Sequence, residues 1–308
     1  MSLKGIFLFV LTNIAVIAVA SITLSLLGVS GYVGQYGLDL GNLLVFAAVF
    51  GFAGSLVSLF LSKWMALQMT GAQVIDPQHP RSQAEAWLVQ TVHRLADKAG
   101  IGHPDVAIYP DPAPNAFATG WNRNNALVAV SSGLLENMTQ EEVEAVLAHE
   151  VAHIANGDMI TMALLQGVVN TFVIFFARIA GYFVDRVIFR NEDDAPGIGF
   201  YIASFIFEIL FGILASTIVM WYSRKREFRA DAGGAYLAGR DKMIAALRRL
   251  MTIHEPAHLP EQLAAFGINE SAGEKLMALF ASHPPLEKRI EYLMNADERQ
   301  LKLGLGLA

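Results

Sequence analysis

The sequence predicts a mainly α-helical integral membrane protein, with four apolar helices and a cytoplasmic α+β part that contains a small β-sheet. Two observations predict this class. Apolar residues make up 54% of the 308 residues and charged residues only 16%, whereas a soluble chain carries about 25% charged residues. In addition, four apolar runs are long enough to cross a bilayer, which takes about 20 residues.

The composition excludes several kinds of site. The chain has no cysteine, so disulfides, thiolate zinc sites and cysteine nucleophiles are ruled out. Its net charge of −6 gives no basic footprint for nucleic acid, and we expect no nucleic-acid partner. We therefore look for chemistry that histidine and carboxylate side chains can perform.

Residues 1–70 are predicted to form an N-terminal transmembrane hairpin. Its two apolar runs cover Gly5 to Leu27 and Leu40 to Leu61. A lysine precedes the first run and Lys63 follows the second, while the loop from Ser30 to Asp39 has no Lys or Arg. Because loops rich in Lys and Arg stay inside, both ends of this hairpin are predicted to be cytoplasmic.

The first run has an alternative interpretation as a cleaved signal peptide, because Lys4 precedes it and it contains Ala18-Val19-Ala20. However, the run continues past that cleavage site and is long for the apolar core of a signal peptide. Even if the first run were removed, the second would return the chain to the cytoplasm. The segment after Lys63 is cytoplasmic under either interpretation.

Residues 71–157 are predicted to form a cytoplasmic part that contains the small sheet. The expected elements are a helix over Arg81–Lys98, which Gly100 ends, and strands over Asp105–Tyr109, Asn115–Thr119 and Ala126–Ser131. The last two strands flank a turn and form a hairpin. Thr139 and Glu142 then fit a capping box that starts another helix, and Asn156-Gly157 ends it.

Residues 158–222 are predicted to form a second membrane hairpin. Asp158 can cap the helix that contains the third apolar run, Met159 to Ala177, and the fourth run covers Ile198 to Tyr222. Arg178 and Glu208 are costly in lipid. The sequence leaves open whether they pair, because the predicted segment ends place them at different depths, and whether both runs fully span.

Residues 223–308 are predicted to form a cytoplasmic helical part that supplies a third metal ligand. It begins with the basic cluster Ser223-Arg224-Lys225-Arg226, which also indicates the cytoplasmic side. The expected helices cover Asp241–Ile253, Gly273–Ala281 and Pro284–Asn295.

The helix that ends at Gly157 carries the motif His149-Glu150-Val151-Ala152-His153. Residues four apart lie on one face of a helix, so both imidazoles point the same way and can share one Zn²⁺. Glu150 then lies beside the water that the metal activates. The same pattern recurs as His254-Glu255-Pro256-Ala257-His258, but Pro256 prevents an unkinked helix, and we interpret that copy as a loop.

A zinc protease needs a third protein ligand. No cysteine is present, and Met159 stands where a metzincin would place a third histidine. A carboxylate remains, and Glu227 is the best candidate. It begins a helical stretch in which Asp231 lies one turn further on the same face, suited to accept a hydrogen bond from a ligand histidine. The alternative is a solvated charge cluster at the end of a membrane helix.

Hydropathy favours Glu227 as the third ligand. The two histidines lie shortly before the third apolar run, and Glu227 lies shortly after the fourth. If these runs form a hairpin, their near ends bring the three side chains to the same patch of membrane surface. Two membrane segments would then assemble one site.

Several segments together resemble the HtpX family of bacterial membrane-bound heat-shock zinc metalloproteases, which is related to the CAAX prenyl peptidases. The matching segments are Leu147 to Asp158, Arg226 to Gly233, Asn115 to Gly120 and Ser282 to Leu286, and the order of apolar runs also matches. The resemblance implies one Zn²⁺ per chain held by His149, His153 and Glu227, with Glu150 as the catalytic acid and base. It also implies a multi-pass protein of the bacterial inner membrane that cleaves misfolded or damaged membrane proteins on the cytoplasmic side, in protein quality control and the stress response.

Two further roles are predicted with an alternative for each. Asn115, Ala116, Phe117 and Ala118 could form an edge strand that pairs with an extended substrate, or a plain hairpin strand. His283 could donate to the oxyanion of the tetrahedral intermediate, or serve only as a structural residue at a helix start.

Other functions remain open at this point. A membrane scaffold with a structural zinc has no use for Glu150 and would close its fourth metal position. A transporter could use Glu208 and Arg178, but the chain lacks the paired broken helices of transporters. The predicted partners are the lipid bilayer and membrane-protein substrates. The sequence does not determine the oligomeric state.

Overall fold

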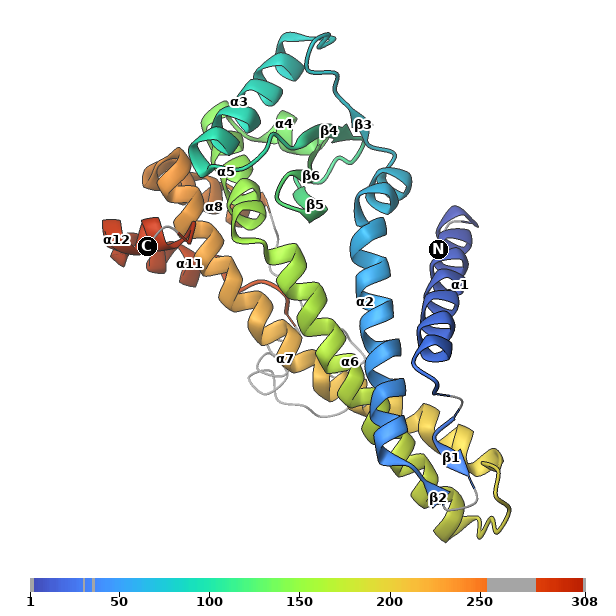
Figure 1. The fold of residues 1–308 in the computed structure, drawn as a ribbon. Coiled ribbons are helices and arrows are strands. Elements are labelled where there is room, and N and C mark those ends of the chain that lie inside the picture. Colours follow the sequence, from blue (N-terminus) through green and yellow to red (C-terminus); the bar gives the residue numbers. More distant parts are fainter. Residues whose placement is uncertain (1–2, 30, 35–36, 254–280, 307–308) are drawn as a thin grey trace. The chain divides into compact units, whose positions relative to one another are not determined.

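The computed structural model describes residues 3–29, 31–34, 37–253 and 281–306, and Figure 1 shows the order of the elements. The chain forms two compact units. The helical unit comprises Met1–Phe60 and Thr161–Val219, and the sheet unit comprises Leu61–Ile160 and Met220–Ala308. The predicted division into four sequence segments stays a prediction.

Four long helices belong wholly or partly to the helical unit: α1 (Leu3–Leu26), α2 (Leu40–Thr70), α6 (Asp158–Phe183) and α7 (Ile198–Ala238). A π-helical turn, η1 (Val184–Ile188), follows α6, and two short paired strands, β1 (Val33–Gly34) and β2 (Gly37–Leu38), separate α1 from α2. By length and composition, all four helices can cross a membrane, and at most 28% of any of their apolar windows is buried. Because exposing that much apolar surface to water is unfavourable, lipid is the surrounding that fits these helices.

Two acidic side chains of the helical unit, Glu208 and Asp185, have ion-pair or hydrogen-bond partners within that unit. Arg178 on α6 and Glu208 on α7 form an ion pair at 2.8 Å, which settles the question that the predicted segment ends left open. Asp185 accepts hydrogen bonds from the side chain of Asn191 and from the backbone N–H groups of Gly197 and Phe200. It thereby ties η1 to the start of α7, where free N–H groups favour an anionic partner.

Two helices are longer than hydropathy predicts. α2 continues from Leu61 to Thr70, and α7 runs without a break to Ala238. The prediction that a separate helix begins at Glu227 was wrong, because Ser223 to Arg226 contain no Gly or Pro that would end the preceding helix. Glu227 and Asp231 therefore lie inside one continuous helix.

The sheet unit contains a four-stranded sheet with the order β3-β4-β6-β5. Its strands are β3 (Gln73–Val74), β4 (Asp105–Tyr109), β5 (Ala116–Asn122) and β6 (Asn125–Ser131). β4 and β6 are parallel, and the other two neighbouring pairs are antiparallel. The predicted β5–β6 hairpin is confirmed, with a tighter turn than expected, and β5 lies at one edge of the sheet.

Six further helices complete the described part of the sheet unit: α3 (Gln83–Ala99), α4 (Ser132–Asn137), α5 (Gln140–Asn156), α8 (Arg240–Ile253), α11 (Leu286–Asn295) and α12 (Glu298–Leu303). One hydrophobic core joins most of these elements. For example, Leu95 of α3, Val130 of β6, Leu147 of α5, Met243 of α8 and Leu293 of α11 are all buried in it.

The boundaries of α5 match the sequence prediction. Thr139 and Glu142 form the capping box, and Gly157 ends the helix in the left-handed conformation with φ 67°. The second His-Glu-x-x-His copy and residues 273–280 of the predicted helix over Gly273–Ala281 lie outside the described residues.

Candidate metal centre

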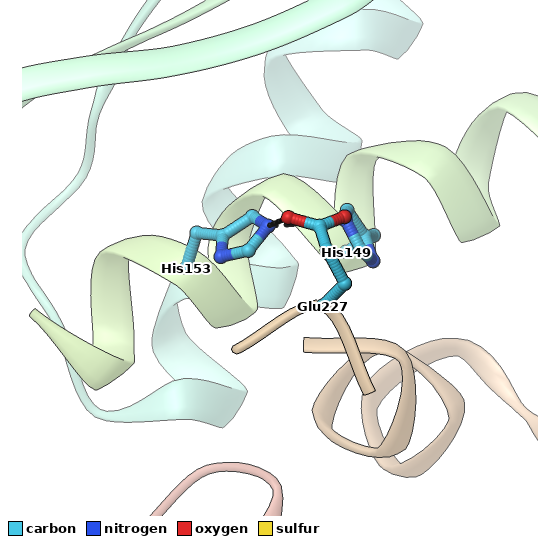
Figure 2. A group of neighbouring side chains, drawn as sticks. All are labelled: His149, His153 and Glu227. Atoms are coloured by element: carbon cyan, nitrogen blue, oxygen red, sulfur yellow. Dashed lines mark hydrogen bonds and ion pairs between the residues drawn. The ribbon is translucent and has the colours of Figure 1, made fainter. Parts of the chain in front are cut away.

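Three buried side chains from two helices converge on one point (Figure 2). His149 and His153 lie on α5 and Glu227 lies on α7, and one donor atom from each is within 4.8 Å of the others. The two Nε2 atoms are 3.1 Å apart, and each lies 3.4 Å from an oxygen of the Glu227 carboxylate. Two helices that are far apart in the sequence thus bring together the three side chains that hydropathy placed near one another.

The close approach of α7 to α5 requires glycine at Gly234. A Cβ atom at this position would lie 3.0 Å from the backbone nitrogen of His149 and 2.3 Å from Cε of Met243. Any larger residue would push the two helices apart or displace Met243. Glu227 lies two helical turns earlier on α7, so its distance from the histidines depends on this contact.

The donor set fits a divalent metal ion. Two imidazole nitrogens and one carboxylate oxygen are the ligands that catalytic zinc sites use. Glu227 is fully buried, and its Oε1 atom has no hydrogen-bond partner among the described residues. A buried carboxylate oxygen without a hydrogen bond is unfavourable, and a bound cation would satisfy it.

Neighbouring carboxylates raise the pKa of both histidines above its ordinary value. Burial lowers the pKa of His149, but the carboxylates of Asp231 and Glu227 outweigh burial and raise its pKa to about 10. Burial also opposes protonation of His153, yet Asp158 and Glu227 raise its pKa. A metal ion at the two Nε2 atoms therefore competes with protons, and metal binding must release any proton held there.

Asp231 lies next to His149, where the sequence predicted a carboxylate. Its Oδ1 atom is 3.0 Å from His149 Nδ1. Arg289 on α11 donates two hydrogen bonds to Asp231, at 2.7 and 2.6 Å, and both residues are buried. Arg289 was not predicted, because the contact joins residues 58 apart and no sequence motif marks it.

Asp158 was predicted only as the start of a helix. In the structure it is 1% exposed, and its Oδ2 atom lies 2.6 Å from His153 Nδ1. A local signal for this contact does exist in the sequence. Asp158 directly follows Gly157, whose left-handed conformation turns the chain back over the last turn of α5.

Glu150 lies at a cleft of about 550 Å³ together with His149 and Glu227. The apolar part of the lining comes mainly from Leu134, Val146, Met243, Ala246, Leu247 and Leu250. Glu150 is partly exposed, so its carboxylate is accessible from the cleft. The arrangement places a metal-ligand set, a free carboxylate and an apolar wall around one space.

The other predicted site residues divide into two groups. Asn115, Ala116 and His283 line the cleft, and His283 Nδ1 lies 2.9 Å from Glu227 Oε2 with the imidazole 61% exposed. Phe117 and Ala118 are not among the lining residues. Phe117 contacts Tyr109, with ring centroids 5.6 Å apart, on the sheet face away from α5.

Known proteins provide an independent comparison. Residues 82–297 match the model of peptidase family M48. Protease HtpX of Hydrogenovibrio crunogenus is 62% identical over 302 residues, which cover 98% of this chain and all of that protein. Protease HtpX of Pseudomonas entomophila is 61% identical over 291 residues, covering 94% of this chain and 98% of that protein.

A solved structure with much lower sequence identity shows the same fold. The crystal structure of S. mikatae Ste24p superposes with a TM-score of 0.59 at 18% identity, covering 81% of this chain and 58% of that protein. The match supports the predicted fold class, which combines apolar helices with a metalloprotease fold. With the family match and these close relatives, the chain belongs to peptidase family M48 and is a membrane metalloprotease that hydrolyses peptide bonds.

Proposed function

We propose that this metalloprotease uses zinc to cleave misfolded or damaged membrane proteins on the cytoplasmic side of the bacterial inner membrane. The observation that carries the proposal is the buried group of His149, His153 and Glu227 beside Glu150. The four apolar helices support a substrate that is itself in the membrane. Lys63 and the basic residues Arg224 to Arg226 support a cytoplasmic position for the cleft, both termini and the active site.

The chain's own residues have separate roles in this mechanism. When bound, zinc supplies an acidified water and a Lewis acid for the peptide carbonyl. Glu150 accepts the proton of the attacking water and later delivers a proton to the departing amine. His283 lies at the same cleft with an exposed imidazole, from which it can donate a hydrogen bond to the oxyanion.

The edge strand β5 is suited to hold an extended substrate. Asn115 O accepts a hydrogen bond from Ser131 N, so the backbone of Asn115 faces β6. Hydrogen-bonding direction alternates along an antiparallel strand, and the register continues with Ala116 opposite Val130. The backbone groups of Ala116 and Ala118 therefore face the outer edge, where a substrate strand can pair with them.

Backbone pairing makes a prediction for modified substrates. In a peptide that the protein cleaves, N-methylation of one amide that pairs with β5 should lower kcat/KM about 2–10-fold, because one hydrogen bond contributes about 0.5–1.5 kcal/mol. A matched peptide carrying the N-methyl group several residues further from the cleaved bond is the control. If no single position near the cleaved bond is sensitive in a full N-methyl scan, β5 does not bind the substrate backbone.

Metal removal tests the proposed function itself. Full-length protein in lipid vesicles should cleave an unfolded membrane protein, lose that cleavage when a chelator removes its metal, and regain it with about one equivalent of Zn²⁺. Metal content measured on the same samples shows whether the loss of cleavage accompanies the loss of metal. Cleavage that continues in samples shown to be free of metal would rule out a metal-dependent reaction.

A further inference from the structure

Asp158, which contacts Nδ1 of His153, is the first residue of a membrane helix. Asp158 begins α6, whose helix forms one of the four candidate membrane spans. Its carboxylate is 1% exposed and lies 2.6 Å from His153 Nδ1. A contact this short between buried polar atoms is typical of a hydrogen bond that involves a charged group.

This contact determines which way His153 offers its lone pair. A carboxylate can only accept, so Nδ1 must carry the proton that it donates to Asp158. The opposite nitrogen, Nε2, lies 3.1 Å from His149 Nε2 and 3.4 Å from Glu227 Oε1. Nε2 is therefore the atom that becomes a metal ligand, and Nδ1–H···Asp158 keeps it in the binding tautomer.

The two histidines have unequal support. Asp231 beside His149 is shared with Arg289, which donates two hydrogen bonds to it. The positive charge of Arg289 therefore partly neutralises the Asp231 carboxylate that His149 faces. Asp158 is paired with His153 at a shorter distance, 2.6 Å against 3.0 Å.

We propose that Asp158 is a positioning residue for the metal site, which fixes the tautomer and ring orientation of His153 and raises its affinity for the metal. The inference rests on the proposed zinc centre. It adds that the start of α6 is part of this centre, so the membrane helix and a metal ligand are joined through one side chain.

A purely structural role is the competing explanation, because aspartate at the start of a helix also stabilises free N–H groups. Asp158→Ser distinguishes the two roles. Serine caps helices about as well as aspartate, but its side chain is one atom shorter and carries no charge to orient His153. Asp158→Asn keeps one acceptor oxygen in a side chain of similar size, removes the charge and replaces the other oxygen by an NH2 donor.

The experiment measures the zinc dissociation constant of full-length protein in detergent, by competition with a chromophoric chelator. We expect Asp158→Ser to weaken zinc binding about 10–100-fold and Asp158→Asn to weaken it less. The matched control is Asp241→Ser, which replaces an exposed aspartate in the first turn of α8. Thermal unfolding of the metal-free proteins and the visible spectrum of bound Co²⁺ accompany the titration.

The outcomes separate the two proposals. A weaker zinc affinity and an altered Co²⁺ spectrum, with metal-free unfolding close to that of the control, support positioning. Zinc affinity within about twofold of wild type in both Asp158 variants overturns it and leaves the zinc centre standing, as does a loss confined to metal-free stability. If wild-type protein binds no zinc at this site, both proposals fail.

Discussion

Replacing Glu150 by Gln is expected to lower kcat/KM for peptide hydrolysis by at least about 10²–10⁴-fold, the usual contribution of a general acid and base. Zinc content should stay at the wild-type level. The amide is nearly the same size as the carboxylate but cannot accept a proton from water. Glu150 lies at the cleft beside His149 without belonging to the group of three ligands, so the substitution separates proton transfer from metal binding.

The measurement uses initial cleavage rates of one peptide, together with metal analysis of each sample. Glu141→Gln is the matched control, because Glu141 is an exposed glutamate on the same helix. It should cleave at the wild-type rate. Retained proteolysis in Glu150→Gln at full zinc content would assign the acid and base role to another residue at the cleft, with His283 the first to test.

Local patterns in the sequence predicted the parts of this site that depend on one helix. The spacing of His149 and His153 places both on one face of α5, and the capping box at Thr139 and Gly157 set the limits of that helix. Hydropathy added Glu227 as a candidate ligand, because the third apolar run begins shortly after the two histidines and the fourth ends shortly before Glu227. These signals are local or periodic, so a single sequence contains them.

Contacts between distant segments were not predictable in the same way. Nothing in the sequence indicated that Arg289 would pair with Asp231 or that β4 would lie parallel to β6. Such pairings depend on how whole helices and strands pack, and neither pairing produces a periodic pattern or a motif in the sequence. The continuous helix α7 was missed for a related reason: a change from apolar to charged residues marks the edge of a membrane span, and a helix can continue through it.

The buried charges around the site support one another. Glu227 lies 2.9 Å from His283 and 3.8 Å from Arg289, in addition to its contacts with the two histidines. Asp231 and Arg289 form a second buried pair behind His149. Charges in such surroundings are favourable only when each has a partner. Removing one carboxylate therefore affects both metal binding and the stability of the metal-free protein.

Replacing Glu227 by Gln or Ala is expected to weaken zinc binding by more than about 100-fold, beyond the range for residues that only support a ligand. Peptide cleavage should be lost with the metal. The substitution also removes the buried carboxylate that the two histidines and Arg289 share as a partner. The metal-free protein should lose about 3–5 kcal/mol of stability, the usual effect of breaking a buried ion pair.

Zinc titration and thermal unfolding of the metal-free protein measure the two effects separately. Glu287→Gln is the matched control, because Glu287 is exposed in the first turn of α11. It should leave zinc affinity unchanged. Zinc bound at one equivalent with wild-type affinity in Glu227→Ala would show that another group supplies the third ligand. Asp158 and Asp231 both face Nδ1 atoms of the histidines. Neither carboxylate can therefore become the third ligand unless an imidazole ring turns over. Undiminished affinity would therefore direct the search for the third ligand to Glu150 and His283, which lie at the same cleft.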